Sequence, residues 1–415
     1  MIVRFCLYSV LKNLRFSDPF LAIYLIELGF SYAEIGGLLG FEKLVTALLE
    51  IPSGYMADHW GRRRILAISF FSHAVGLSIL ALGALSDVPA LLWFFLGLGI
   101  YGVGEAFRTG SHKAIMLDYL DVAGRGSEST AVLSLTRTFS KGSSALAGVV
   151  AGGLLYLLND YSALFWLSAV AALFGCGLVL SYPKYLEGET ARQRKEPEKT
   201  IDPHEYKLGA MLRNPKMWPL LVRSVVYESQ VEVLLKLFLQ PFLYQGLTAA
   251  GLPIGGVDAA AKRGTGSLLV GVNELFRDSL GAVGAKNSAR AERRFADRRS
   301  VLRIIYLLTT VAVAVLTLAA VDASRFSLVL VGLATVGALT FLQNLRRPIF
   351  VSELNEVANK PLRATILSID SQARSFMVAA QLPLLGLAAD HWGLWTVGAI
   401  TGVLMLVGAL FYSRG

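Results

Sequence analysis

Apolar segments long enough to cross a membrane follow one another along almost the whole chain. A spanning helix needs about 20 mostly apolar residues, and short polar connections separate most of these segments. We expect twelve membrane-spanning helices, at 2–27, 33–53, 65–86, 89–120, 128–156, 161–182, 216–246, 264–285, 301–321, 326–355, 361–387 and 392–412. The first is interpreted as a retained helix and not as a signal peptide, because Lys12 and Arg15 interrupt its apolar run and no cleavage site follows. The pattern therefore predicts an all-α integral membrane protein.

One connection is longer and more polar than the others. It runs from Pro183 to Pro215 and separates the twelve segments into two sets of six. We therefore expect a six-helix bundle at 1–182, a cytoplasmic linker at 183–215 and a second six-helix bundle at 216–415.

The two sets of segments resemble each other when the chain is displaced by 234 residues. At this displacement His112-Lys113 matches Arg346-Arg347 and Gly152 matches Gly386. The first segments resemble each other more loosely and at a different displacement, as in Arg4-x3-Tyr8 and Arg223-x3-Tyr227. Each match is weak, but their shared order indicates an internal duplication. The repeat predicts two pseudo-symmetric six-helix bundles.

Composition and charge support a membrane protein and set its orientation. Hydrophobic residues make up 54% of the chain and charged residues 17%, against about 25% charged in soluble proteins. If both termini are cytoplasmic, the inner connections hold 20 Lys and Arg residues and the outer connections three. Lys and Arg concentrate on the cytoplasmic side of membrane proteins. The net charge of +9 therefore reflects topology, and we expect no nucleic-acid partner.

Motifs for enzymatic chemistry are missing from the sequence. We find no phosphate-binding loop, zinc-ligand cluster or nucleophile elbow, and Cys6 and Cys176 lie in apolar segments without metal-ligand spacing. We expect no cofactor, no metal and no enzyme activity.

The connection between the second and third segments carries Gly54-Tyr55-Met56-Ala57-Asp58-His59-Trp60-Gly61-Arg62-Arg63-Arg64. Its spacing and predicted cytoplasmic side resemble the signature of the major facilitator superfamily. The resemblance implies that family's twelve-helix fold and makes this loop a conformational latch, here formed by Gly54, Asp58, Gly61, Arg62 and Arg63. From the residues themselves, we expect Gly54 to let two helices approach closely and Gly61 to permit a tight turn.

Two other stretches bear on this resemblance. A near copy, Ala389-Asp390-His391-Trp392-Gly393, precedes the last segment on the predicted outer side, so we expect no second inner latch there. Gly148-Val149-Val150-Ala151-Gly152-Gly153 has the glycines of the exporter motif but lacks its proline. This departure argues against a proton-driven drug exporter.

Ionisable residues near the centres of predicted spans are the candidates for a functional site. Each costs about 2.5–3.5 kcal/mol to insert, so we expect them to face a polar interior. Several are spaced three or four apart and share one helix face. The candidates for the substrate or proton pathway are Lys12, Arg15, Asp18, Glu42, Glu105, Arg108, Arg137, Lys141, Glu228, Glu232, Lys236, Glu274, Arg277, Arg346, Arg347, Asp370 and Arg374.

The sequence therefore predicts a monomeric secondary active transporter of the bacterial inner membrane. It would move a small polar or charged organic solute by alternating access, with coupling to protons. The candidates for proton coupling are Glu105, Glu228, Glu232, Glu274 and Asp370. Because acidic and basic candidates are balanced, the sign of the substrate's charge stays open. The alternatives are a multidrug efflux pump and a non-transporting sensor or scaffold on the same fold.

Overall fold

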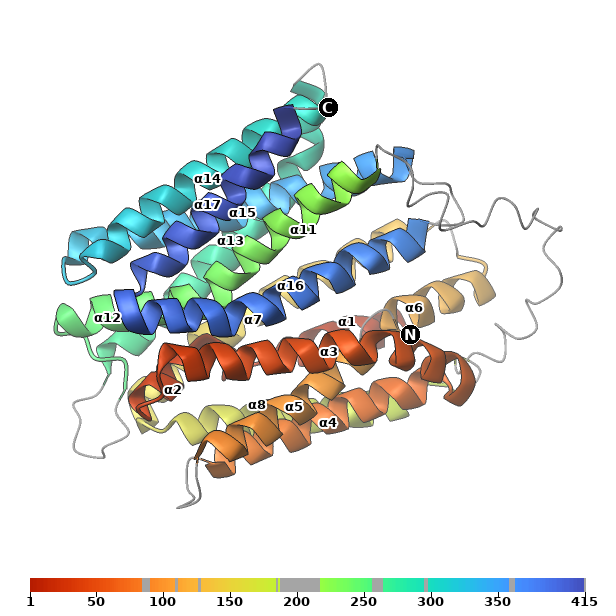
Figure 1. Cartoon of the computed structure of the whole chain (residues 1–415). Helices are drawn as coiled ribbons and strands as arrows, with labels where there is room; N and C mark the ends of the chain where they lie inside the picture. The colour runs from red at the N-terminus through yellow and green to blue at the C-terminus, as the bar shows by residue number, and fades with distance from the viewer. Residues whose placement is uncertain are drawn as a thin grey trace. The chain divides into compact units, whose positions relative to one another are not determined.

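The computed structural model describes residues 1–83, 90–108, 111–125, 128–183, 186, 217–255, 264–294, 298–357 and 363–413 (Figure 1). Within these ranges every regular element is a helix. The predicted linker at 183–215 lies almost wholly outside the described residues.

Each predicted span has a helical counterpart. The first half contains α1 (Ile2–Leu11), η1 (Asp18–Phe20), α2 (Leu21–Glu27), α3 (Tyr32–Trp60), α4 (Arg62–Gly83), α5 (Ala90–Arg108), α6 (Ser111–Val122), α7 (Ser129–Leu158) and α8 (Tyr161–Leu180). The second half contains α11 (Met217–Val233), the π-helical turn η5 (Leu234–Phe238), α12 (Leu239–Ala249), α13 (Thr265–Arg294), α14 (Arg298–Val321), α15 (Phe326–Val357), α16 (Arg363–Trp392) and α17 (Trp395–Ser413).

Six helices of the described structure are long and apolar enough, by length and composition, to cross a membrane. They are Arg62–Gly83, Leu91–Leu120, Ala131–Leu158, Tyr161–Leu180, Arg298–Val321 and Phe326–Leu354. The other predicted spans are divided into shorter helices, as in 2–27, or carry more ionisable residues, as in α13.

The prediction of one continuous helix at 2–27 is wrong, because the chain is irregular between α1 and η1. Pro19 stands in the first turn of η1, has no N–H to donate to the Arg15 carbonyl, and its ring would clash with that carbonyl in a continuous α-helix. The backbone N–H groups of Phe16 and Ser17 both donate to the Ser168 hydroxyl, at 2.9 and 3.3 Å. A side chain of α8 thus satisfies the donors that the break leaves free.

The structure forms two compact units by residue packing. Unit 1 comprises Met1–Leu21, Phe41–Lys199 and Gly255–Leu275, and unit 2 comprises Ala22–Gly40, Thr200–Ile254 and Phe276–Gly415. Each unit consists mainly of one half of the sequence and takes one short segment from the other half. Helices α3 and α13 therefore each contribute to both units.

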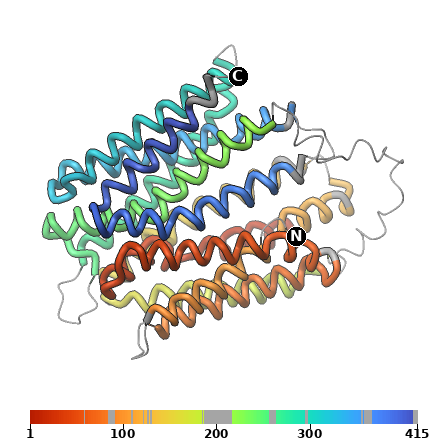
Figure 2. The backbone as a smooth tube through the Cα atoms, in the orientation of Figure 1, coloured from red at the N-terminus to blue at the C-terminus, as the bar shows by residue number. Residues whose placement is uncertain are grey.

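The two units pack their helices in the same order (Figure 2). In unit 1, α4 packs against α5 and α8, while α1 packs against α7 and α8. In unit 2, α14 packs against α15 and α17, while α11 packs against α16 and α17. In each half, the third helix therefore meets the fourth and sixth, and the first meets the fifth and sixth. The predicted pseudo-symmetry is confirmed.

The two similar sequences that end in His-Trp-Gly form the same helix end. Gly61 follows α3 with a φ of +99°, and Gly393 follows α16 with a φ of +95°. His59 Nδ1 lies 2.8 Å from the carbonyl oxygen of Tyr55, and His391 Nδ1 makes the corresponding contact at 3.0 Å. Glycine adopts this left-handed conformation without the penalty that other residues pay.

Candidate functional site

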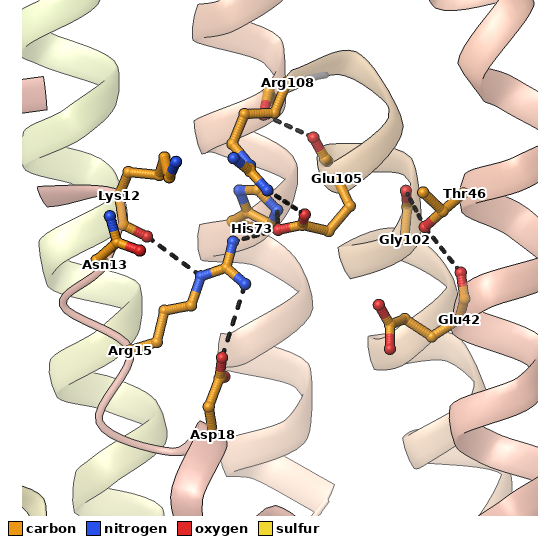
Figure 3. A network of polar contacts seen from close by, with 12 residues as sticks. Lys12, Asn13, Arg15, Asp18, Glu42, Thr46, His73, Gly102, Glu105 and Arg108 are labelled. Carbon is orange, nitrogen blue, oxygen red and sulfur yellow. Dashed lines mark hydrogen bonds and ion pairs between the residues drawn. The ribbon is translucent and has the colours of Figure 1, made fainter. Parts of the chain in front are cut away.

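Glu105 of α5 is the centre of a group of charged side chains in unit 1, the Glu105 cluster (Glu105, Arg15, Arg108 and His73; Figure 3). Its Oε1 accepts a hydrogen bond from Arg15 and lies 3.1 Å from Nε2 of His73. Its Oε2 accepts from Arg108 at 2.5 Å. The four side chains are between 6% and 24% exposed, so the ion pairs are largely shielded from solvent.

The break in the first span places Arg15 in this cluster. Arg15 Nε donates to the Lys12 carbonyl at 3.2 Å, an acceptor that a continuous helix would use for its own hydrogen bonds. The guanidinium also lies 3.6 Å from Asp18 and 5.3 Å from the ring centroid of Tyr101. Arg15 is therefore held from four directions. A small cavity adjoins it, with polar lining residues Lys12, Arg15, His73, Tyr101 and Ser168.

Glu228 of α11 is the centre of a second group in unit 2, the Glu228 cluster (Glu228, Arg346, Arg347 and Gln343). Its Oε1 accepts from Arg346 at 3.0 Å. Its Oε2 accepts from the Gln343 amide at 3.0 Å and lies 3.7 Å from Arg347. The side chains of Glu228 and Arg346 are 2% and 0% exposed, so this pair is closed to solvent.

Asp370 of α16 is buried, and the positive charges that act on it are those of Arg374 and Arg346. Its Oδ1 has no hydrogen-bond partner among the described residues. The sequence placed Asp370 and Arg374 on one face, but Arg374 forms its ion pair with Glu232, at 3.8 Å. Asp370 is therefore a buried carboxylate without an ion pair in the described structure.

The two clusters lie beside matching aromatic residues. In unit 1, the Tyr8 ring stacks on His112 with centroids 3.4 Å apart. In unit 2, the guanidinium of Arg346 lies 4.3 Å from the centroid of the Tyr227 ring. These four residues are the pairs that the sequence repeat matched, so the contact between the first and fourth helices of each half is duplicated.

The other candidates for the pathway lie outside these two groups. Asp18 contacts only the edge of the Glu105 cluster, through Arg15. Glu42 and Glu274 are buried, Lys141, Lys236 and Arg277 are half-buried, and Arg137 is exposed.

The predicted latch is described in part. Arg62 lies 2.5 Å from Asp118 of α6, and Arg63 donates to the Tyr182 carbonyl at 2.9 Å. The side chain of Asp58 lies outside the described residues. In the second half, Arg299 lies 3.6 Å from Glu353 of α15, so the contact of Arg62 with the fourth helix is repeated.

The expectation for Gly54 is wrong. Helix α3 continues through this residue to Trp60, and a Cβ added to Gly54 would meet no atom within 4 Å. Helix α3 approaches a neighbour closely at its other end, where a Cβ on Gly36 would lie 2.2 Å from the Leu382 carbonyl oxygen. The close contact of α3 with its neighbour therefore requires glycine at Gly36 and not at Gly54 of the signature.

His73 and Tyr101 belong to the site but were not predicted. Yet His73 is the one ionisable residue of the segment 65–86, and a polar group in a buried apolar run needs a partner. This signal was present in the sequence. Tyr101 carried no comparable signal, because tyrosines are common in membrane helices.

Comparison with known proteins gives one family for the chain. The family model described as Major Facilitator Superfamily matches residues 5–379. Among curated relatives, the uncharacterized MFS-type transporter YxaM of Bacillus subtilis (strain 168) is 26% identical over 156 residues, 37% of each chain. Multidrug resistance protein MdtH of Proteus mirabilis (strain HI4320) is 28% identical over 179 residues, 40% of each chain. The matches thus span about two fifths of these relatives.

The fold is also found among solved structures. A crystal structure of a mutant of the nucleoside transporter NupG superposes with a TM-score of 0.76 at 14% sequence identity. The match covers 99% of this chain and 98% of the other. At this identity the likeness shows a shared fold.

Proposed function

Because the chain belongs to the Major Facilitator Superfamily, we propose that it is a secondary active transporter for a small polar or charged organic solute. One observation carries the proposal: each half of an apolar helical protein encloses an ionised cluster that joins its first and fourth helices. Charges at membrane depth are costly and mark substrate or ion pathways. Alternating access of two halves would expose such clusters to each side in turn.

The two halves take different parts in this proposal. The Glu105 cluster has a cavity beside it and contacts the solute. Asp370 carries the proton, because it is buried and has no ion pair among the described residues. A carboxylate with these properties can gain and lose a proton without breaking a salt bridge.

The remaining features follow the sequence-based expectations. Residues 1–182 and 216–415 form the two moving bundles of a monomer, with both termini in the cytoplasm of a bacterium. Arg62 and Arg63 act in a latch at the cytoplasmic ends of α4, α6 and α8. The excess of Lys and Arg in the predicted inner connections supports this orientation.

The test is flux into proteoliposomes under an imposed pH gradient. A thermal-stability screen of organic solutes first supplies a ligand, since a ligand that binds the folded state raises the unfolding temperature. We expect gradient-driven accumulation of that solute by the natural protein. Asp370→Asn should abolish accumulation but keep exchange of solute across the membrane. Asp160→Asn, which removes a carboxylate from an exposed helix cap, is the matched control.

The alternatives give different outcomes. Accumulation of apolar cations, with none for polar solutes, would favour a multidrug exporter. Ligand binding without flux in any direction would favour a sensor or scaffold on the same fold.

A further inference from the structure

The Lys12 side of the Glu105 cluster contains more hydrogen-bond donors than acceptors. Lys12 makes no side-chain hydrogen bond or ion pair with a described residue. Nε of Arg108 and the hydroxyls of Tyr8 and Tyr101 are buried, and none has an acceptor in the described structure. A buried donor without an acceptor forfeits its hydration free energy. Three such donors beside the half-buried ammonium of Lys12 indicate that the acceptor comes from outside the chain.

The charges around Lys12 are mostly positive. The ionised groups that act on its ammonium are Arg108, Arg15, Glu105 and Lys113, of which only one is an acid. The Glu105 carboxylate is already shared by two arginines. Asp18 bonds to Arg15 on the opposite side of that guanidinium from Lys12 (Figure 3). A neutral acceptor would satisfy the hydrogen bonds and leave this positive excess, whereas an anion would satisfy both.

We propose that Lys12 and Arg108, with the hydroxyls of Tyr8 and Tyr101, bind an anionic group of the solute, a carboxylate or a phosphate. This assignment rests on the proposed function and names the chemical class of its substrate.

The test measures thermal unfolding of the purified full chain in detergent, with inorganic phosphate and succinate against chloride at equal ionic strength. We expect both anions to raise the unfolding temperature of the natural protein. Lys12→Gln should remove at least half of this rise, and it should fold, because Lys12 has no partner to lose. Arg125→Gln removes the same charge from an exposed connection and should keep the full rise.

Three results would overturn the assignment. They are no rise with either anion, an equal rise in Lys12→Gln, or a rise with phosphatidylglycerol micelles and none with the free anions. The last result would make the anion a lipid headgroup. Flux measurements distinguish failure of this proposal from failure of the proposed function. A protein that transports only neutral solutes would contradict the anion site but would still be a transporter.

A second inference comes from the C-terminal end of α16. The carboxylate of Asp390 accepts two backbone hydrogen bonds from the start of α3, from Tyr32 N–H and Ala33 N–H, each at 2.8 Å. The first N–H groups of a helix have no partner within it, and the helix dipole favours a negative charge there. Helix α3 is therefore capped by a residue more than 350 positions away in sequence.

Close packing of backbones surrounds this cap. A Cβ on Gly386 would lie 2.1 Å from the Tyr32 carbonyl oxygen, and one on Gly40 would lie 2.8 Å from that of Ala379. The Tyr32 hydroxyl accepts from the Gln245 amide at 2.7 Å. The start of α3 thus belongs to unit 2, while α3 from Phe41 onward belongs to unit 1. Helix α3 therefore has residues in both units.

We infer that Asp390 is a releasable lock. Its two hydrogen bonds hold α3 against α16 in this state and break during the transport cycle. The inference rests on the proposed function, because only a protein that changes state needs a lock of this kind. It also gives a role to the second Ala-Asp-His-Trp-Gly sequence, which the inner latch does not use.

The test is the labelling rate of a cysteine placed in the contact, Leu382→Cys, in a chain whose two natural cysteines are replaced by alanine. Leu382 is fully buried, so labelling by a membrane-impermeant maleimide reports opening. Asp390→Asn should raise the rate about two- to fivefold, because it keeps one of the two acceptor oxygens but removes the negative charge that the helix dipole favours. Asp160→Asn removes a carboxylate that caps its own helix, α8, and should leave the rate unchanged.

An unchanged rate in a folded Asp390→Asn protein would overturn the lock, and so would an equal increase in both variants. Asp390→Glu keeps the charge and should restore part of the slow labelling. The readout needs no substrate, so it stands apart from the flux measurement that tests the proposed function.

Discussion

In unit 1 the first span supplies Arg15, from the irregular segment after α1, and the fourth span supplies Glu105. In unit 2 the polarity is reversed, because the first span supplies Glu228 and the fourth supplies Arg346. The repeat matches Arg346 with His112 and not with Glu105, so the two ion pairs are not copies of each other. The duplication keeps the contact between the first and fourth spans, and each half places its own charges there.

The two pairs also differ in how closed they are. The Glu105 side chain is 15% exposed and its partner Arg15 lines a small cavity, whereas Glu228 is 2% exposed and faces an arginine with no exposure. The ring centroids of Tyr8 and Phe70 lie 5.3 Å apart in an edge-on contact, and those of Tyr227 and Tyr306 do the same. The aromatic packing beside the two clusters is therefore alike. Under the proposed function, the Glu105 cluster would bind the solute and the Glu228 cluster would hold its half together.

The largest expected effect separates these two roles. Glu228→Ala leaves Arg346 as a buried charge without its main partner, which should cost about 3–5 kcal/mol of unfolding free energy. Glu105→Ala should cost clearly less, because its arginines are partly exposed and can rehydrate. Unfolding by SDS in mixed micelles measures both values. Equal losses would show that both clusters are structural.

A second prediction tests the duplicated helix contacts. Gly152 and Gly386 match in the repeat, and an added Cβ would lie 2.5 and 2.1 Å from the carbonyl oxygens of Ser267 and Tyr32. Alanine at either position should destabilise by about 1–3 kcal/mol. Gly153→Ala meets no atom within 4 Å and should be neutral or stabilise by about 0.5–1 kcal/mol. The same SDS unfolding assay measures these changes in unfolding free energy. An equal decrease in Gly153→Ala and Gly152→Ala would contradict the packing described.

The smallest effect concerns the aromatic partners. Arg346→Lys keeps the charge but loses the planar contact with Tyr227 and should cost about 1–2 kcal/mol. His112→Phe keeps a flat ring on Tyr8 and should cost less than about 1 kcal/mol. If His112→Phe were the more damaging change, the histidine would hold a polar role that its stacking does not explain.

Much of the fold could be predicted from the sequence, because bilayer thickness fixes the length of an apolar span. Pro19 marked the break between α1 and η1, but its partners Ser168 and Glu105 could not be predicted, because they are distant in the chain. The sequence named the charged residues but not their partners. The spacing of Asp370 and Arg374 indicated a shared helix face, and it did not indicate that Arg374 pairs with Glu232 of another helix.

The glycines also show what the sequence could not predict. The sequence pointed to Gly54 because of its motif, while the close contact is at Gly36, whose neighbour Gly37 meets no atom within 4 Å. Which face of a helix meets a partner depends on the tertiary arrangement. A motif marks an end of a helix well, as Gly61 does, but it does not say what lies beside that end.

The π-helical turn Leu234–Phe238 contains one residue more than a regular helix would need to reach the same point. Removing that residue would return the segment to a regular α-helix and keep the faces of α11 and α12 in register. Gln240, whose amide oxygen accepts from the Ala22 N–H at 2.7 Å, would keep its direction. A relative with a single gap at this turn can therefore keep the bond between the two segments, whereas a gap elsewhere in α11 or α12 would rotate every residue beyond it by about 100°.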